Sequence, residues 1–343
     1  MRARELGIRI GDLEPGPLDS IADVAGVRVG HTTLIQGDDV RTGVTVVVPA
    51  DRHVFAGADR LNGNGELTGL EWIRESGLLT TPIGLTNTHS VGVVRDALVA
   101  AAVARPEAPS WSLPVVGETW DGRLNDVNGF HVRPEHVHTA LESASTKVQE
   151  GNVGGGTGMV CHGFKGGIGT SSRVTEAGHT VGALVQANHG RRPRLQIDGV
   201  PVGKELGPDR IPLPDDTPAG SIIVLVATDA PLLPHQCKRL ARRASFGIAR
   251  TGGAGENTSG DLILAWASGN RGLESADVVA LEMLPNDSID PLFYAAIEAT
   301  EEAIVNAMLA AETMTGRGVT VQRLDPEALT EVMARHGRLA SSA

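Results

Sequence analysis

Ser221 is the residue of this sequence that is best placed to act as a nucleophile. It follows Gly220, where a stretch with four prolines and two adjacent acidic residues (207–220) meets an apolar run (221–227). The stretch predicts an exposed, irregular loop, and the run predicts a central buried strand. Glycine reaches backbone conformations that are closed to other residues, so Gly220 can hold a strained peptide bond.

A cut at this bond would make Ser221 a self-sufficient nucleophile. If its hydroxyl attacked the Gly220 carbonyl, an N-to-O acyl shift followed by hydrolysis would split the chain there. The new α-amine would titrate near ~7.7–8.0 and could accept the hydroxyl proton at neutral pH without a histidine. On the local pattern alone, a serine that merely begins a strand is the more common case.

Three further polar residues could assist such a nucleophile. Ser259 and Asp261 are two positions apart at a predicted strand start, so both side chains point to one face. A carboxylate there can orient a hydroxyl or hold a substrate ammonium. Asn188 ends another predicted apolar strand, where a fixed amide N–H can donate to a developing oxyanion. Each residue also fits an ordinary strand end.

Three more residues could contact a substrate. Glu118 and Trp120 lie in a Glu-Thr-Trp-Asp-Gly segment that is typical of a strand end turning into a loop. A carboxylate in a partly apolar cleft offsets the cost of desolvating a free ammonium, and an indole can wall the pocket. Lys165 precedes Gly166 and Gly167 and could stabilise negative charge or lower the pKa of a nearby amine. The alternatives are loop-building residues and a solvated surface lysine.

Strands and helices are predicted along the whole chain. Strands are expected at 27–34, 43–48, 172–176, 180–187, 221–227, 262–267 and 319–322, and helices at 66–75, 90–103, 231–250, 290–312 and 326–336. Strands in contiguous groups, with helices able to cover them, indicate a layered α/β fold rather than a doubly wound sheet. We interpret 207–220 as a surface loop rather than a domain linker, so a single domain (1–343) is expected.

Composition excludes several classes of protein. The 343 residues include 30 basic and 41 acidic side chains, a net charge of −11, which disfavours nucleic acid or an anionic membrane as a partner. Two cysteines, Cys161 and Cys237, are too few for a disulfide scaffold or a four-thiolate zinc site. No apolar run is long enough for a membrane helix, and the start lacks the apolar stretch of a signal peptide. A cytoplasmic protein is expected.

Two other kinds of site are disfavoured. The glycine-dense segment 151–158 follows no clear strand and matches neither a dinucleotide fingerprint nor a P-loop. His131, His136 and His138 lie in a proline-containing segment without a zinc-binding helix motif, so we interpret them as surface residues. No G-x-S-x-G elbow is present. We therefore expect neither cofactor nor metal.

Six blocks between about residues 14 and 323 carry a family resemblance. They are LDSIADVAGVRVGH (18–31), NTHSVG (87–92), GETWDG (117–122), FKGGIGTSSR (164–173), SIIVLVATDAPLLPHQ (221–236) and NTSGD (257–261). They resemble the D-aminopeptidase and L-aminopeptidase–D-esterase family, which also includes β-peptidyl aminopeptidases and hydrolases of nylon oligomers. The resemblance implies an αββα four-layer sandwich of the N-terminal-nucleophile-hydrolase type.

The resemblance also assigns roles. It implies self-cleavage between Gly220 and Ser221, into a large subunit (1–220) and a small subunit (221–343), with Ser221 as the nucleophile. Ser259 and Asp261 would relay protons and position the new α-amine, although some relatives have Glu in place of this Asp. Asn188 would donate to the oxyanion.

The remaining roles concern the substrate. Glu118 would hold the substrate ammonium, Trp120 would wall the pocket where some relatives have Tyr, and Lys165 would lie near the site.

The function expected is a self-processing aminopeptidase or amidase. It would hydrolyse the N-terminal amide or ester bond of short peptides and aminoacyl amides through an acyl-enzyme on Ser221. The alternative is an acyltransferase of similar architecture that passes the acyl group to an amine. An unprocessed, inactive binding protein is a third alternative, which the intact Gly220–Ser221 pair and the Ser259-x-Asp261 spacing argue against. The resemblance also suggests a homo-oligomer of processed αβ heterodimers.

Overall fold

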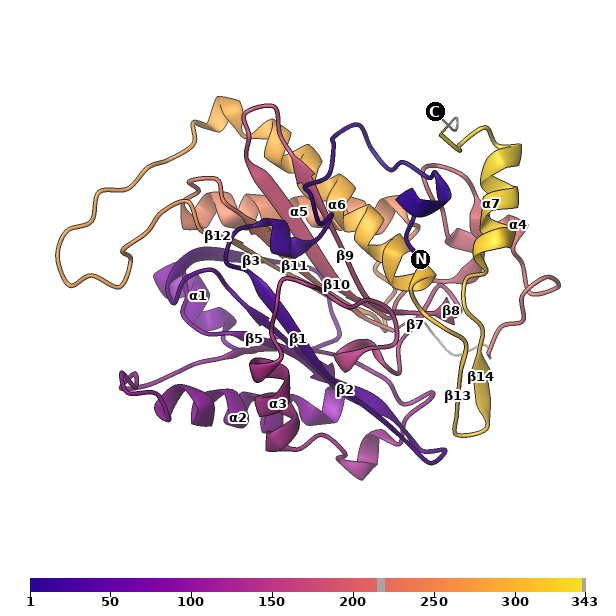
Figure 1. Cartoon of the computed structure of the whole chain (residues 1–343), viewed down its shortest axis with the longest axis horizontal. Coiled ribbons are helices and arrows are strands. Elements are labelled where there is room, and N and C mark those ends of the chain that lie inside the picture. The colour runs from indigo at the N-terminus through magenta and orange to yellow at the C-terminus, as the bar shows by residue number, and fades with distance from the viewer. Residues whose placement is uncertain (215–219, 341–343) are drawn as a thin grey trace.

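Two β-sheets face each other at the centre of the molecule. The computed structural model describes residues 1–214 and 220–340, and Figure 1 shows its layers. The smaller sheet has the order β1 (Arg28–Gln36), β2 (Val40–Val48), β5 (Ile83–Asn87) and β6 (Val115–Thr119). The larger sheet has the order β4 (Leu78–Leu79), β3 (Val54–Gly63), β12 (Gly260–Ala267), β11 (Ile222–Thr228), β10 (Thr180–Ala187) and β9 (Gly167–Val174).

Helices cover the outer face of each sheet. α2 (Val91–Val103) and α3 (Pro134–Glu142) pack on the smaller sheet, and α5 (Pro234–Arg250) and α6 (Asp290–Leu309) pack on the larger one. The four layers are therefore helix, sheet, sheet and helix, and the predicted αββα sandwich is confirmed. No helix in the described ranges is long and apolar enough to cross a membrane.

The strand after Gly220 shows why its sequence is continuously apolar. Ile223, Leu225 and Ala227 of β11 pack between the two sheets. The alternate residues Ile222, Val224 and Val226 pack beneath the helices. Both faces of β11 are thus buried, as the unbroken apolar run predicted.

Shorter elements complete the fold. They are α1 (Leu70–Ser76), α4 (Val202–Glu205), α7 (Pro326–Arg335), the β7–β8 pair (Val160–Cys161, Phe164–Lys165) and the β13–β14 pair (Met314–Gly316, Val319–Val321). Short 3-10 helices lie at Arg4–Leu6, Ile21–Asp23, Thr88–Ser90, Val127–Gly129, Gly154–Gly156, Arg192–Arg194 and Asn286–Ser288. The two ends of the described chain meet, because Ala340 N–H donates to Gly7 O at 2.8 Å.

Several predicted bounds differ from the structure. The helix expected at 66–75 begins at Leu70, because Gly69 adopts a left-handed conformation with φ of 73°. The helix expected at 290–312 ends at Leu309. His136 and His138 of the proline-containing segment lie on α3, which Pro134 begins. β3 was not predicted, because its sequence VFAGADRLNG lacks strand-like apolar alternation. Residues 215–219 of the predicted loop lie outside the described residues.

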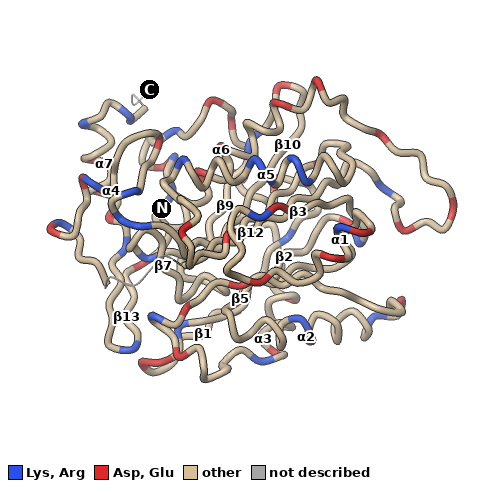
Figure 2. Tube along the Cα trace, turned by 180° about the vertical axis from the view of Figure 1, so that it is seen from behind, with Lys and Arg blue, Asp and Glu red and all other residues tan. Residues whose placement is uncertain are grey.

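Charges are distributed over the whole molecule. Figure 2 shows basic and acidic segments interspersed along the trace. This interspersed pattern accompanies the net charge of −11.

Several predicted site residues meet where three interior strands of the larger sheet begin or end. β11 runs parallel to β12, with Ile222 opposite Asp261, and antiparallel to β10, with Ile222 opposite Ala187. The starts of β11 and β12 therefore meet the end of β10. Ser221, Asn188 and the residues around Gly260 are brought together by this register.

Candidate active site

Ser221 lies directly before β11, with its side chain in the interior of the protein. Only 5% of the residue is exposed. Its carbonyl accepts a hydrogen bond from Asn188 N–H at 3.1 Å, and its Oγ accepts one from Gly260 N–H at 3.1 Å. Among residues 1–214 and 220–340, no histidine, lysine or carboxylate side chain hydrogen-bonds to this hydroxyl. In the intact chain the described part therefore supplies no side-chain base for Ser221.

Asn188 holds its amide in one orientation beside Gly220. Its Oδ1 accepts from Val160 N–H at 2.7 Å, and its Nδ2 donates to Trp120 O at 2.9 Å. A Cβ added to Gly220 would lie 2.3 Å from Asn188 Nδ2, so this amide nitrogen lies directly against the bond before Ser221. The amide is placed where it could stabilise an oxyanion formed at that carbonyl.

Ser259 and Asp261 form a buried pair next to the nucleophile. Ser259 Oγ donates to Asp261 Oδ1 at 2.5 Å, although Ser259 lies one residue before β12. Gly260, between them, is the donor to Ser221 Oγ. Burial is the largest cause that raises the pKa of Asp261; with a smaller contribution from Glu256, and against the opposing hydrogen bond from Ser259, the pKa rises to about 6. The predicted proximity of these residues to Ser221 is therefore present.

Glu118 reaches the site from the other sheet. It lies on β6, is buried, and accepts hydrogen bonds from Glu66 N–H at 3.0 Å and from Thr88 Oγ1 at 2.5 Å. A Cβ on Gly65 would lie 3.1 Å from Glu118 Oε1 and 3.2 Å from Gly260 Cα. Glu118 and Gly260, which donates to Ser221 Oγ, therefore both lie next to Gly65.

The electrostatics of Glu118 suit an ammonium. Burial raises the pKa of this carboxyl, with its two hydrogen bonds opposing the rise. Among the described side chains, no lysine or arginine forms an ion pair with it. A buried carboxylate without a cation gains most from the arrival of one, so the predicted role of binding a substrate ammonium is compatible with this setting.

Trp120 and Lys165 occupy different environments. Trp120 is 41% exposed, and its ring lies over Gly122, while its carbonyl holds Asn188. Lys165 is fully buried, and its Nζ donates to Met159 O at 2.6 Å, Gly166 O at 2.9 Å and Gly156 O at 3.5 Å. Lys165 is thus not a solvated surface residue. Its contacts are with protein carbonyls, and a contact with substrate stays a prediction.

The sequence reasoning missed a polar network behind the site. Asp121 accepts from Asn87 Nδ2 and Asn125 Nδ2, both at 3.0 Å, and burial raises its pKa to about 6. Gln186 Nε2 donates to Thr119 Oγ1 at 2.8 Å and so joins the two sheets. The NTHSVG and GETWDG blocks contain Asn87, Thr119 and Asp121, but no local pattern in them predicts that these side chains lie together.

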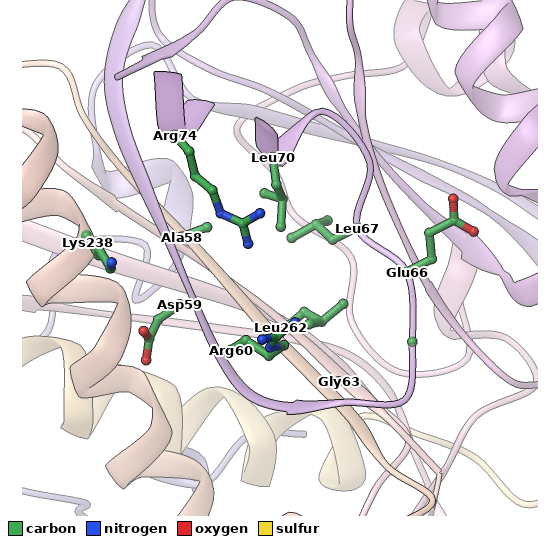
Figure 3. Close-up of a pocket in the computed structure, with 11 residues that line it drawn as sticks. Ala58, Asp59, Arg60, Gly63, Glu66, Leu67, Leu70, Arg74, Lys238 and Leu262 are labelled. Atoms are coloured by element: carbon green, nitrogen blue, oxygen red, sulfur yellow. The ribbon is translucent and has the colours of Figure 1, made fainter. Parts of the chain in front are cut away.

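A cavity of about 400 Å³ lies beside the active site without containing it. Figure 3 shows Arg60, Arg74 and Lys238 around it, together with Leu70 and Leu262. Gly63, Gly65 and Glu66 form one wall. None of the site residues predicted from the sequence lines this cavity.

The described residues hold one group of side chains with metal-ligand chemistry. Cys161, His162 and His189 each place a ligand atom within 4.8 Å of the others, and all three are buried. Lys165 and Arg192 lie close enough to influence Cys161 and His162 electrostatically. Two neighbouring cations oppose the binding of a divalent ion. His131, His136 and His138 form no such group in the described ranges.

The αββα sandwich, with Ser221 directly before the interior strand β11, is the arrangement that the sequence predicted for a hydrolase of the N-terminal-nucleophile type. Residues 19–321 match the family model described as peptidase family S58, and the chain belongs to that family. It is a serine-type aminopeptidase, as the sequence predicted.

Named relatives support the assignment across the full length. The chain is 48% identical to the β-peptidyl aminopeptidase BapA of Sphingosinicella microcystinivorans, with 99% of this chain and 94% of that protein covered. A β-aminopeptidase from Burkholderia sp. superposes with a TM-score of 0.93 at 54% identity, covering 98% and 99% of the two chains.

A second solved structure gives the fold its name. The L-aminopeptidase D-Ala-esterase/amidase from Ochrobactrum anthropi superposes with a TM-score of 0.90 at 43% identity, covering 99% of each chain. It is described as a prototype for the serine aminopeptidases and a variant of the Ntn hydrolase fold. The predicted family and fold are confirmed.

Proposed function

We propose that this protein cuts its own chain between Gly220 and Ser221, and that the processed form removes the N-terminal residue of short peptides and aminoacyl amides. The observation that carries the proposal is the setting of Ser221. Its hydroxyl lies against Gly260 N–H, and no described side chain acts as its base. A nucleophile in this position needs a base from its own residue, and cleavage at Gly220 would create one.

The chemistry then follows from the neighbouring groups. The freed α-amine of Ser221 accepts the proton from Oγ as Oγ attacks the substrate carbonyl. Asn188 Nδ2 donates to the oxyanion, and the departing amine receives the proton. Water repeats the sequence on the Ser221 ester and releases the amino acid. Asp261 and Ser259 hold the α-amine in place.

We infer that the acyl residue carries a free ammonium and that β-amino acids are accepted. Glu118 lies within reach of the site as a buried carboxylate without a described cation partner. Two relatives, at 48% and 54% identity, are named β-peptidyl aminopeptidase and β-aminopeptidase. A panel of L-, D- and β-aminoacyl p-nitroanilides would test the inference, and turnover of only α-aminoacyl compounds would contradict it.

The same panel separates hydrolysis from acyl transfer. With a free amine such as hydroxylamine added, a hydrolase releases mainly the amino acid. If most of the acyl group is found on the added amine at low concentrations of that amine, the acyltransferase alternative holds instead.

Replacing the nucleophile tests the whole proposal. Ser221→Ala should leave a single full-length band and no hydrolysis, whereas Ser245→Ala, at a half-buried position of α5, should process and turn over normally. The expected fragments of the parent protein are 1–220 and 221–343. The proposal fails if catalytically competent protein contains no fragment beginning Ser-Ile-Ile-Val, or if Ser221→Ala retains turnover.

We further infer that the processed subunits form a homo-oligomer. The segment between β12 and α6 extends away from the body of the molecule (Figure 1). It exposes the apolar residues Val278, Leu281 and Met283, which a second copy of the chain could cover. Light scattering after size exclusion should give a multiple of the αβ mass, and Val278→Asp with Leu281→Asp should reduce it; a monomeric αβ parent contradicts the inference.

A further inference from the structure

Lys165 is a buried lysine whose acceptors are all backbone carbonyls. Its ammonium donates to Met159 O, Gly166 O and Gly156 O, which matches its three N–H donors with three acceptors. No carboxylate in the described part of the chain forms an ion pair with it. Burial lowers its pKa to about 7. A lysine in such a costly position requires an explanation beyond packing.

The peptide unit between Met159 and Val160 links this lysine to the active site. Its carbonyl oxygen accepts from Lys165 Nζ at 2.6 Å, and its N–H group donates to Asn188 Oδ1 at 2.7 Å. The peptide unit is planar, so fixing the direction of its oxygen also fixes the direction of its N–H. A charged donor on the oxygen also polarises the unit and strengthens the N–H as a donor.

The amide of Asn188 depends on this contact for its orientation. The terminal torsion of asparagine is soft, and a half-turn exchanges Oδ1 and Nδ2. Val160 N–H selects the orientation that places Oδ1 inward and Nδ2 beside Gly220. One N–H of Nδ2 is held by Trp120 O. The other can serve the oxyanion, whereas the flipped amide would present an oxygen to it.

The glycine-dense segment explains how the lysine reaches these carbonyls. A Cβ on Gly155 would lie 2.2 Å from Gln186 Oε1, and a Cβ on Gly156 would lie 2.4 Å from Ile168 N. Only glycine allows this backbone to lie so close to β9 and β10. The glycine-dense segment thus brings the Gly156 and Met159 carbonyls within hydrogen-bond reach of Lys165 Nζ.

We propose that Lys165 is a positioning residue for catalysis, acting through the Met159–Val160 peptide to hold the Asn188 amide as the oxyanion donor. The proposal rests on the proposed function of Ser221. It assigns Lys165 no contact with substrate.

The test is a double-mutant cycle with Asn188. Lys165→Met keeps the length of the side chain and removes the donors. In processed protein, quantified by the mass of the fragment beginning at Ser221, we expect kcat on an aminoacyl p-nitroanilide to fall ~10²-fold with KM changed less than about threefold. In the Asn188→Ala background, Lys165→Met should lower kcat by less than about threefold, because the donor it positions is already absent.

Controls separate this role from a structural one. Lys204→Met, on the exposed surface of α4, should change neither kcat nor KM. If Lys165→Met does not fold, Lys165→Gln, whose shorter, uncharged side chain keeps an amide NH₂ group, replaces it in the same cycle with a smaller loss. Losses that multiply in the double variant overturn the proposal, as does an unchanged kcat in either Lys165 variant. Turnover by Ser221→Ala would instead refute the proposed function itself.

Discussion

Asp261 and Glu118 are two buried carboxylates whose different neighbours favour different roles. Asp261 accepts from Ser259 and lies opposite Ile222, immediately beside the nucleophile. Glu118 accepts from Glu66 and Thr88, across Gly65 from Gly260. Burial raises the pKa of both. Their positions indicate an effect on proton transfer for Asp261 and on substrate binding for Glu118.

Asp261 should contribute an acidic limb to the pH profile. Its pKa is raised from 3.8 to about 6, so it loses its charge, and its ability to hold the protonated amine, as pH falls through about 6. Activity should therefore fall more steeply with acidity below about pH 6 than above it. Asp261→Asn should lower kcat ~10–100-fold and remove that steeper region. The assignment is wrong if the variant keeps the parent's profile shape below pH 6.

Glu118→Gln should weaken substrate binding more than it slows chemistry. The neutral amide keeps the hydrogen-bonding shape but loses the charge that meets an ammonium. We expect KM to rise ~10–100-fold for a substrate with a free amine, with kcat reduced much less. Glu135→Gln, an exposed carboxylate on α3, is the control and should change KM little. A large fall in kcat at constant KM would contradict this and show that Glu118 acts in the chemical step.

At the scale of elements, a buried arginine holds β9 to α6 and to the N-terminal segment. Arg173 is fully buried and donates to Glu302 at 2.6 Å, Glu298 at 3.2 Å and Ile10 O at 2.6 Å. These contacts join residues that lie far apart in the sequence. The layer of α6 on the larger sheet therefore depends on a satisfied ionic cluster as well as on apolar packing.

Arg173→Met should destabilise the protein strongly, because Glu298 and Glu302 would keep buried charges without their main partner. A loss of about 3–5 kcal/mol in the free energy of unfolding is expected. Arg323→Met, which breaks an exposed pair with Glu312, should cost less than about 1 kcal/mol. Urea unfolding followed by circular dichroism gives both values, and equal losses in the two variants would contradict the expectation.

At the scale of the whole molecule, the proposed cut would divide one shared core. β11 lies between β10, which belongs to 1–220, and β12, which belongs to 221–343, and β12 pairs in turn with β3. The apolar cluster beneath the helices includes residues on both sides of position 220. Separation would expose this core to water at a large cost.

The two fragments should therefore remain associated after processing. They should elute together from a size-exclusion column under native conditions and separate only in denaturant. The measurement uses the parent protein, in which Gly220 and Ser221 are unchanged. Fragments that part spontaneously in buffer would show that the larger sheet does not hold across the cut.

Much of the fold could be predicted from local pattern, but some elements could not. The unbroken apolar run of β11 and the four- and three-residue spacing on α5 identify a buried strand and an amphipathic helix. β3 carries glycine, alanine and charged residues and becomes a strand only because β12 pairs with it. The glycines of 154–156 show no periodicity, and only the structure shows that they pack closely against β9 and β10.

By itself the sequence determined the class of chemistry. It contains a serine after a glycine at a loop–strand junction, an acid two residues beyond a second serine, and an asparagine at a strand end. The chain carries these chemical groups in any conformation. Only the tertiary structure decided which of them meet. The parallel pairing of β11 with β12 places Gly260 N–H on Ser221 Oγ, and the Met159–Val160 peptide orients Asn188. These contacts join positions tens of residues apart, and no local pattern encodes a distance that arises only when two sheets close on each other.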